Sequence, residues 1–155
     1  MVKKLAIIAF TVLLLAGGCK NTESGDADAH KADPEAEKMV LAYAFLLEKL
    51  QEDNIIFIAS EVDKNLNSIR DIIREEGLKL EVENYGNLEK RPDLCYYSKS
   101  TKKLVAVIDI TKKSEDSYYV SYYLGPEGGA SKEIQIEKKN GDWAIEYDDG
   151  MWIIK

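Results

Sequence analysis

The spacing of apolar residues changes near Leu78, and this change limits the possible folds more than any other feature of the sequence. Before Leu78, apolar side chains recur every three or four residues, the spacing of one face of a helix: Ile55, Ile58, Val62, Leu66, Ile69 and Ile73. From Leu78 onward, Leu78, Leu80 and Val82 alternate with charged residues, as in a strand with one buried face. Helices followed by a run of strands predict the α+β class, with helices packed on one face of an antiparallel sheet of about four to six strands.

Two helices are expected in the first half of this domain. Residues 33–35 (DPE) begin the first helix, because an acid can cap it and proline suits its first position. Residues 39–47 (MVLAYAFLL) are apolar on every side, which predicts a central core helix; a second apolar face for a partner is the alternative. Residues 53–54 (DN) separate this helix from the second one, which Gly77 would end. The two helices should pair as an antiparallel hairpin.

The remaining residues alternate in hydrophobicity and contain strong turn signals. Asn140-Gly141 is the strongest short hairpin signal, and residues 125–129 (GPEGG) predict a loop between strands. Asp149-Gly150 marks a further turn, and residues 85–93 should form a loop. Strands are expected at residues 78–83, 104–111, 118–124, 133–138, 143–147 and, as a terminal strand or flap, 151–154. Residues 94–97 form a short apolar segment after the loop.

The amino-terminal segment has the composition of a secretory signal. Lys3 and Lys4 precede an apolar run over residues 5–16, which is shorter than the roughly 20 apolar residues of a bilayer-spanning helix. The small residues 16–18 (AGG) then lead to Cys19. An ordinary signal peptide with a cysteine near the cut is one interpretation of this pattern.

The same residues resemble bacterial lipoprotein precursors, in which small residues precede a lipid-bearing cysteine. The resemblance implies cleavage between Gly18 and Cys19, diacylglycerol on the Cys19 sulfur and acylation of its amino group. Two or three fatty acyl chains anchor a protein stably in a membrane, since each buried CH₂ contributes about 0.8 kcal/mol. The resemblance therefore implies a protein anchored by lipid in the bacterial cell envelope. Because Lys20 follows the cysteine, the resemblance leaves open sorting to the outer membrane, where the protein would face the periplasm or the cell surface.

This organisation divides the chain into three parts. On this resemblance, residues 1–18 are expected to be the signal peptide, and residues 19–32 the lipidated cysteine with a polar tether that contains no large apolar side chain. Residues 33–155 form a single domain of ordinary size. No metal site is expected among the acids and the histidine of the tether. With Cys19 lipidated, Cys95 has no partner within the chain, so it is expected to be a buried small apolar residue.

The charge of the mature chain limits its partners. The full chain has 21 basic and 28 acidic residues, and removal of Lys3 and Lys4 with the signal peptide leaves a net charge of −9. So acidic a surface repels phosphate backbones and anionic lipid headgroups. Nucleic-acid binding is therefore not expected, and the membrane is a partner only through the lipid anchor.

The sequence lacks the usual residue patterns of catalysis. Its single histidine, His30, lies in the tether, whereas Ser-His-Asp and Cys-His catalysis require a base held by a rigid scaffold. No zinc-protease, P-loop or dinucleotide-binding motif is present. We therefore expect a non-catalytic protein with no cofactor and no metal; an acid–base enzyme using carboxylates alone is the weakest alternative.

Two strands carry the candidate contact residues. Strand alternation puts Asp109, Tyr119 and Tyr123 on one face and Tyr118 and Tyr122 on the other, core face. Tyrosines offer broad apolar area with a polar tip, which suits a contact surface; ordinary cross-strand packing is equally consistent. Asp109 would either point to solvent or, if shielded from water, act on a ligand.

Two functional hypotheses follow for this domain. The first is a protein-binding module of the envelope, of the assembly, inhibitor or immunity type. The second is a small-molecule binding module. The closing segment Lys-Asn-Gly-Asp-Trp-Ala-Ile at residues 139–145 resembles the end of the NTF2-like fold, in which helices cover a curved sheet. That resemblance implies a pocket between helices and sheet, with Asp109, Tyr119 and Tyr123 as lining candidates.

Overall fold

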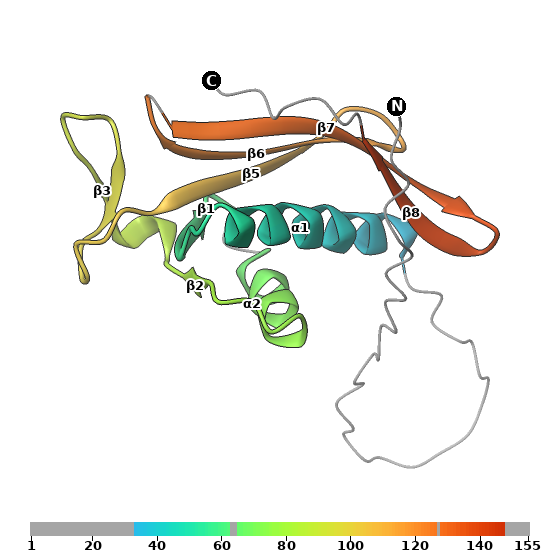
Figure 1. Ribbon diagram of the computed structural model, residues 1–155, viewed down its shortest axis with the longest axis horizontal. Coiled ribbons are helices and arrows are strands. Elements are labelled where there is room, and N and C mark those ends of the chain that lie inside the picture. The colour runs from blue at the N-terminus through green and yellow to red at the C-terminus, as the bar shows by residue number, and fades with distance from the viewer. Residues whose placement is uncertain (1–32, 63–64, 127, 148–155) are drawn as a thin grey trace, which may run out of the picture.

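A computed structural model describes residues 33–62, 65–126 and 128–147, which form one layered α+β unit (Figure 1). Six strands form the main sheet, in the order β2-β1-β5-β6-β7-β8, and β3 and β4 form a separate two-stranded sheet. The helices are α1 (Pro34–Glu52) and α2 (Leu66–Glu75), with a short 3₁₀ turn at Tyr85–Asn87. The strands are β1 (Phe57–Ser60), β2 (Glu81–Val82), β3 (Leu88–Lys90), β4 (Tyr96–Ser98), β5 (Ala106–Lys112), β6 (Ser117–Gly125), β7 (Gly128–Lys139) and β8 (Asp142–Tyr147). The predicted α+β class is confirmed.

Helix α1 is the central element of the core. It lies between the sheet and α2 (Figure 1) and contacts β6, β7 and α2. Leu46, Leu47 and Leu50 are completely buried, which explains why its sequence is apolar on every side. At its start, Asp33 accepts a hydrogen bond from the Glu35 amide at 3.0 Å, and Pro34 occupies the first turn, as the sequence predicted.

The predicted helical hairpin is wrong in one respect: a strand separates the two helices. Residues 57–60 form β1, which pairs in parallel with both β2 and β5. Consequently the sheet is mixed rather than antiparallel. Ile58 and Ala59 are both completely buried, on opposite faces of β1. A four-residue strand that is buried on both faces has no alternation, and its apolar residues cannot be told from a helical stretch by spacing.

Several predicted boundaries also move. Leu78 and Leu80 precede β2, which contains only two residues, and β3 lies within the expected loop 85–93. β7 begins at Gly128 rather than at residue 133, so Gly128 and Gly129 of the expected loop belong to a strand, and the register with β6 shifts between Tyr123 and Gly125. The Asn140-Gly141 turn is confirmed, with φ of 56° and 93°, the left-handed values of a two-residue hairpin turn. The expected strand at 151–154 and the whole signal and tether lie outside the described residues.

The main sheet has two different faces. Ile108, Tyr118 and Val120 point toward the helices and belong to the main core. Asp109 pairs with Ser121, and Val107 pairs with Tyr123, on the opposite face. There, Ala59, Leu88, Val105 and Val107 form a small second cluster against residues of the β3–β4 sheet. Both described helices lie on the other side (Figure 1), so we call this second surface the helix-free face.

Candidate functional site

Tyr118 and Tyr122 link the sheet to α1. The Tyr118 side chain is completely buried, and its hydroxyl donates a hydrogen bond of 2.8 Å to Glu35. The Tyr122 hydroxyl donates a bond of the same length to Asp53, just after α1. Burial, followed by the bond to a carboxylate, raises the pKa of both phenols. These two candidate contact residues therefore serve the packing of α1 on the sheet.

The hydrogen bond from Tyr118 to Glu35 predicts that the stability of the fold depends on pH. Lys112, whose ammonium lies 2.6 Å from the Glu35 carboxylate, and then Tyr118 lower the pKa of this carboxyl below 4.5. A carboxyl whose pKa is depressed by folding stabilises the folded state above its unfolded pKa, and this stabilisation is lost as the pH falls through the folded pKa. We expect Glu35→Gln to lower stability at pH 7 slightly, by less than about 1 kcal/mol, because the pair is partly exposed.

The measurement is urea unfolding at pH 7 and near pH 3. The difference in the free energy of unfolding between Glu35→Gln and the native chain should be smaller near pH 3 than at pH 7. Glu75→Gln, on the exposed end of α2, is the matched control and should show little effect at either pH. A difference that stays constant across this range would contradict the assignment.

Asp109, Tyr119 and Tyr123 all lie on the helix-free face, but the structure brings only two of them together. Asp109 and Tyr123 line a depression of about 350 Å³ between the β3–β4 sheet and strands β5 to β7. Tyr119 lies beside it, where its hydroxyl and that of Ser131 are 2.6 Å apart and the Lys113 ammonium lies 5.3 Å from its ring centre. We call this depression the tyrosine depression; its main side chains are Glu61, Lys90, Tyr96, Asp109, Ser121 and Tyr123.

The tyrosine depression is not in the position that the small-molecule hypothesis implied. That hypothesis expected a pocket between helices and sheet. Asp109 and Tyr123 instead point away from the helices, because they have the opposite parity to the core residues Ile108 and Val120. The same residues therefore form an open depression on the outer surface of the sheet.

An aromatic cluster forms one side of the tyrosine depression. The rings of Tyr96 and Tyr123 meet edge to face with centres 6.1 Å apart, and Tyr85 lies 5.9 Å from Tyr96. The Tyr123 hydroxyl donates a 3.1 Å bond to the Leu94 carbonyl, and the Lys90 ammonium lies 5.2 Å from the Tyr96 ring centre. Such pairs are favourable beyond the area they bury, so the cluster has a defined shape.

Two carboxylates face the aromatic cluster. Glu61 accepts a 2.9 Å bond from the Tyr85 hydroxyl, which also lies 3.4 Å from the Tyr96 hydroxyl. The hydrogen bond with Tyr96, then burial, and then the hydrogen bond to Glu61 raise the pKa of the Tyr85 phenol. Asp109 is exposed and accepts a 2.9 Å bond from the Thr111 hydroxyl. Of the two possibilities for Asp109, the structure favours exposure to solvent over burial among apolar side chains.

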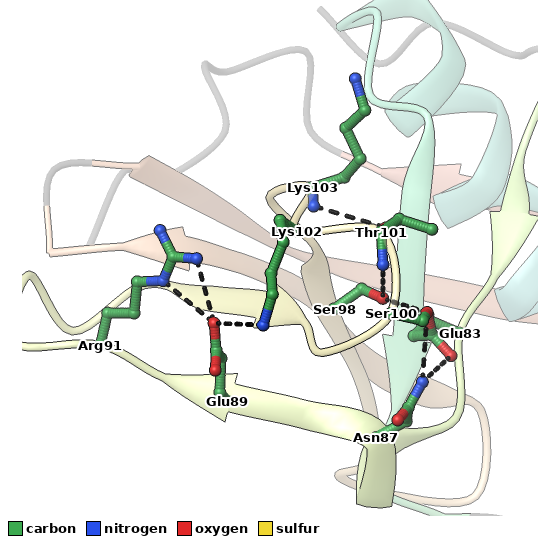
Figure 2. A network of polar contacts seen from close by, with 9 residues as sticks. All are labelled: Glu83, Asn87, Glu89, Arg91, Ser98, Ser100, Thr101, Lys102 and Lys103. Atoms are coloured by element: carbon green, nitrogen blue, oxygen red, sulfur yellow. Dashed lines mark hydrogen bonds and ion pairs between the residues drawn. The ribbon is translucent and has the colours of Figure 1, made fainter.

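A polar network holds the β3–β4 sheet, and with it Tyr96, in position (Figure 2). Ser98 is completely buried, and its hydroxyl donates a 2.6 Å bond to Glu83 and accepts one of 3.1 Å from the Thr101 amide. Asn87 donates to the second Glu83 oxygen at 3.1 Å. The bond from Ser98, followed by the bond from Asn87, lowers the pKa of the Glu83 carboxyl. On the other side of the same sheet Glu89 accepts bonds from Arg91 and lies 3.5 Å from the Lys102 ammonium.

Cys95 packs against the turn between β6 and β7. It is a free, half-buried cysteine, and burial raises the pKa of its thiol. Gly125 allows this contact, since a Cβ at that position would lie 2.4 Å from the Cys95 sulfur. The structure agrees with the expectation of a packing role, although the side chain is only partly buried.

Sequence reasoning missed several residues of the tyrosine depression. Glu61 follows β1 directly, in a stretch interpreted as helix, and Lys90 lies in a stretch interpreted as loop. Tyr96 lies in the short apolar segment whose partner strand was not recognised. The only signal in the sequence was the density of tyrosines around residues 96–97 and 118–123, and it does not say which tyrosines share a face.

Among the residues that the structure describes, no group of three or more His, Cys, Asp or Glu side chains is arranged to hold a metal ion. No helix in the described ranges is long and apolar enough to cross a membrane. Cys19 and His30 lie outside the described residues.

Comparison with known protein families, with curated proteins and with solved structures finds no match to this chain.

Proposed function

We propose that this protein is a lipid-anchored, non-catalytic binding protein of the bacterial cell envelope, held by Cys19, that contacts a protein partner with its helix-free face. The observation that carries the proposal is the tyrosine depression. It combines an ordered aromatic cluster with two carboxylates on a face where neither described helix lies. Tyrosines at the centre of a contact surface commonly supply most of the binding energy.

The charges favour a partner with a basic contact segment. Glu61 and Asp109 outnumber Lys90 in the depression, and the mature chain has a net charge of −9. A surface of one sign speeds encounter with a partner of the opposite sign and disfavours other acidic chains. An exposed Lys or Arg side chain of the partner, placed between the tyrosine rings and the carboxylates, would have both charge and ring contacts.

The test is a crosslinked pull-down from native envelopes with the acylated full-length protein as bait. Mass spectrometry would identify both the recovered proteins and the Cys19 modification. We expect one near-stoichiometric partner whose affinity falls by about 30-fold or more with Tyr123→Ala, the loss typical of a central aromatic contact, and by less with Asp109→Asn.

The control is Asp71→Asn, which removes the same charge from the exposed surface of α2; it should bind like the native chain. Each variant is first checked for an unchanged melting temperature, so that loss of binding is not loss of folding. A partner recovered equally by Tyr123→Ala and the native chain would place the contact elsewhere. An unmodified Cys19 would contradict the anchor.

A small-molecule ligand is the second candidate, favoured by one observation. A volume of about 350 Å³ with mixed polar and aromatic lining lies at the lower end of the usual range for ligand pockets. In this case a ligand should raise the melting temperature of the native chain but not of Asp109→Asn or Tyr123→Ala. Tyr119→Ala should respond like the native chain, because Tyr119 lies beside the depression rather than in it.

A further inference from the structure

Strand β2 forms one edge of the main sheet. It is the first strand in the order β2-β1-β5-β6-β7-β8, and among the described strands it pairs with β1 alone. The amides of Glu81 and Glu83 both donate to carbonyls on the β1 side, at 2.7 and 2.8 Å. Because the direction of N–H and C=O alternates along a strand, Val82 directs its N–H and C=O away from β1. This edge therefore presents backbone groups to which a further strand can bind.

A groove runs along this edge, between β2 and α2, which lie next to each other (Figure 1). We call it the α2–β2 groove; it has a volume of about 320 Å³, and its main side chains are Arg70, Ile73, Arg74, Leu78, Leu80 and Val82. Leu80 belongs to the main core, and Ile73, Leu78 and Val82 pack against it. The floor of the groove is therefore apolar, and the two arginines are exposed beside it.

The arginines make the α2–β2 groove basic in an otherwise acidic chain. The full chain has a net charge of −7, yet both charged side chains that line this groove are arginines. Arg70 and Arg74 are four residues apart on α2, so they are neighbours on one face of the helix. Arg74 also pairs with Asp71 at 2.8 Å, but this pair is exposed and such pairs contribute little. The charge that complements this groove is therefore a carboxylate of another molecule.

We propose that the outer edge of β2 binds an extended segment of a partner protein as an added strand, with acidic side chains directed into the α2–β2 groove. In complexes of this kind, main-chain hydrogen bonds to the sheet edge supply affinity and pockets for alternate side chains supply specificity. Every second side chain of the added strand lies on the groove side. There Arg70 and Arg74 select carboxylates, and the apolar floor selects an aliphatic residue.

The charged side chains of the β2 segment leave the groove side open. Charged residues on an edge strand commonly prevent pairing with another chain, and Lys79 and Glu81 are exposed residues of this kind. Their parity is opposite to that of Leu80 and Val82, whose side chains pack toward the main core, so they point to the other face of the sheet. Because Lys79 and Glu81 have opposite signs, the residues of the partner on that face should be uncharged.

Peptide binding to the full chain tests this proposal. The probe is a short peptide with blocked ends, Thr-Glu-Thr-Val-Thr-Glu-Thr, whose glutamates and valine share one face when it is extended. We expect saturable shifts of the Val82 amide resonance with a Kd of about 1 mM or lower. At saturation the Val82 amide should exchange its hydrogen about ten-fold or more slowly than in the unbound chain. The Glu81 amide, which donates to the β1 side, is the internal control and should change little.

The arginine variants test the charge of the partner. Arg70→Gln combined with Arg74→Gln should weaken binding of the probe about three-fold or more, because two exposed ion pairs with the peptide are lost. Arg91→Gln is the matched control; it removes the same charge next to Glu89 of β3 and should bind the probe like the native chain. A second probe with lysine in place of glutamate should bind more weakly. Absence of saturable binding, or equal binding of the two probes, would overturn the proposal.

Val82→Pro tests strand addition itself. Proline removes the N–H that points away from β1 and is tolerated on edge strands for this reason. Binding of the probe should weaken about five-fold or more, whereas Val82→Thr, which keeps the amide, should bind like the native chain. Probe binding that Val82→Pro does not change would mean that the peptide does not join the sheet, which contradicts the proposal. If this variant is shown by circular dichroism to be unfolded, the arginine variants decide.

The α2–β2 groove and the tyrosine depression can be tested separately, because they share no lining residue. Tyr123→Ala should bind the probe like the native chain, and the paired arginine variant should leave binding at the helix-free face unchanged. Loss of probe binding in Tyr123→Ala would place the peptide in the tyrosine depression and exclude the edge of β2 as its site.

Discussion

Leu47→Ala is expected to lower the free energy of unfolding by about 3 kcal/mol, within the roughly 2–5 kcal/mol found for truncation of buried leucines. Leu47 is completely buried in α1, which lies between the sheet and α2 (Figure 1). Because α1 has neighbours on both sides, they cannot all collapse into the space that the missing methyl groups leave. The result is a lasting cavity in addition to the lost transfer free energy.

The measurement is urea unfolding followed by far-ultraviolet circular dichroism. Leu104→Ala is the matched control, since Leu104 is 41% exposed just before β5, and it should cost less than about 1 kcal/mol. The midpoint should fall for Leu47→Ala with little change in slope, as expected when only stability changes. A cost below 1 kcal/mol for Leu47→Ala, or equal costs for the two variants, would contradict the central position of α1.

Gly129→Ala is expected to destabilise the protein by about 2 kcal/mol or more. The φ of Gly129 is +143°, a value that residues with a side chain rarely adopt, and such strain costs of order 1–3 kcal/mol. A Cβ at this position would also lie 2.7 Å from the Tyr122 carbonyl oxygen. That oxygen belongs to the neighbouring strand, so relief of the contact requires the β6–β7 pairing itself to shift.

Gly86→Ala is the control for this second experiment. Gly86 has an ordinary φ, and nothing lies within 4 Å of the position its Cβ would take, so its replacement should change stability by less than about 0.5 kcal/mol. Both variants are compared by thermal unfolding. Because Gly129 borders the tyrosine depression, Gly129→Ala should also weaken partner binding. A neutral Gly129→Ala would contradict the positive φ of Gly129 and the close approach of the Tyr122 carbonyl oxygen to this position.

Local features of the chain could be predicted from the sequence because their causes are local. The start of α1 depends on Asp33 and Pro34, and the β7–β8 hairpin depends on Asn140 and Gly141, which adopt the positive φ values required by the turn. The separation of Asp109 and Tyr123 from the core follows from strand alternation alone, and the register of β5 with β6 confirms it. In each case neighbouring residues contain all the information.

The tertiary structure alone decided the features that depend on residues far apart in the chain. β1 is a strand because β5, almost fifty residues later, offers it a parallel partner and the two faces of the sheet bury Ile58 and Ala59; nothing in residues 57–60 themselves distinguishes it from a helix. The same holds for the tyrosine depression, which combines Glu61, Tyr96 and Tyr123 from three separate segments. Spacing along the chain predicts which residues share a face of one element, whereas the meeting of separate elements depends on the packing of the whole domain.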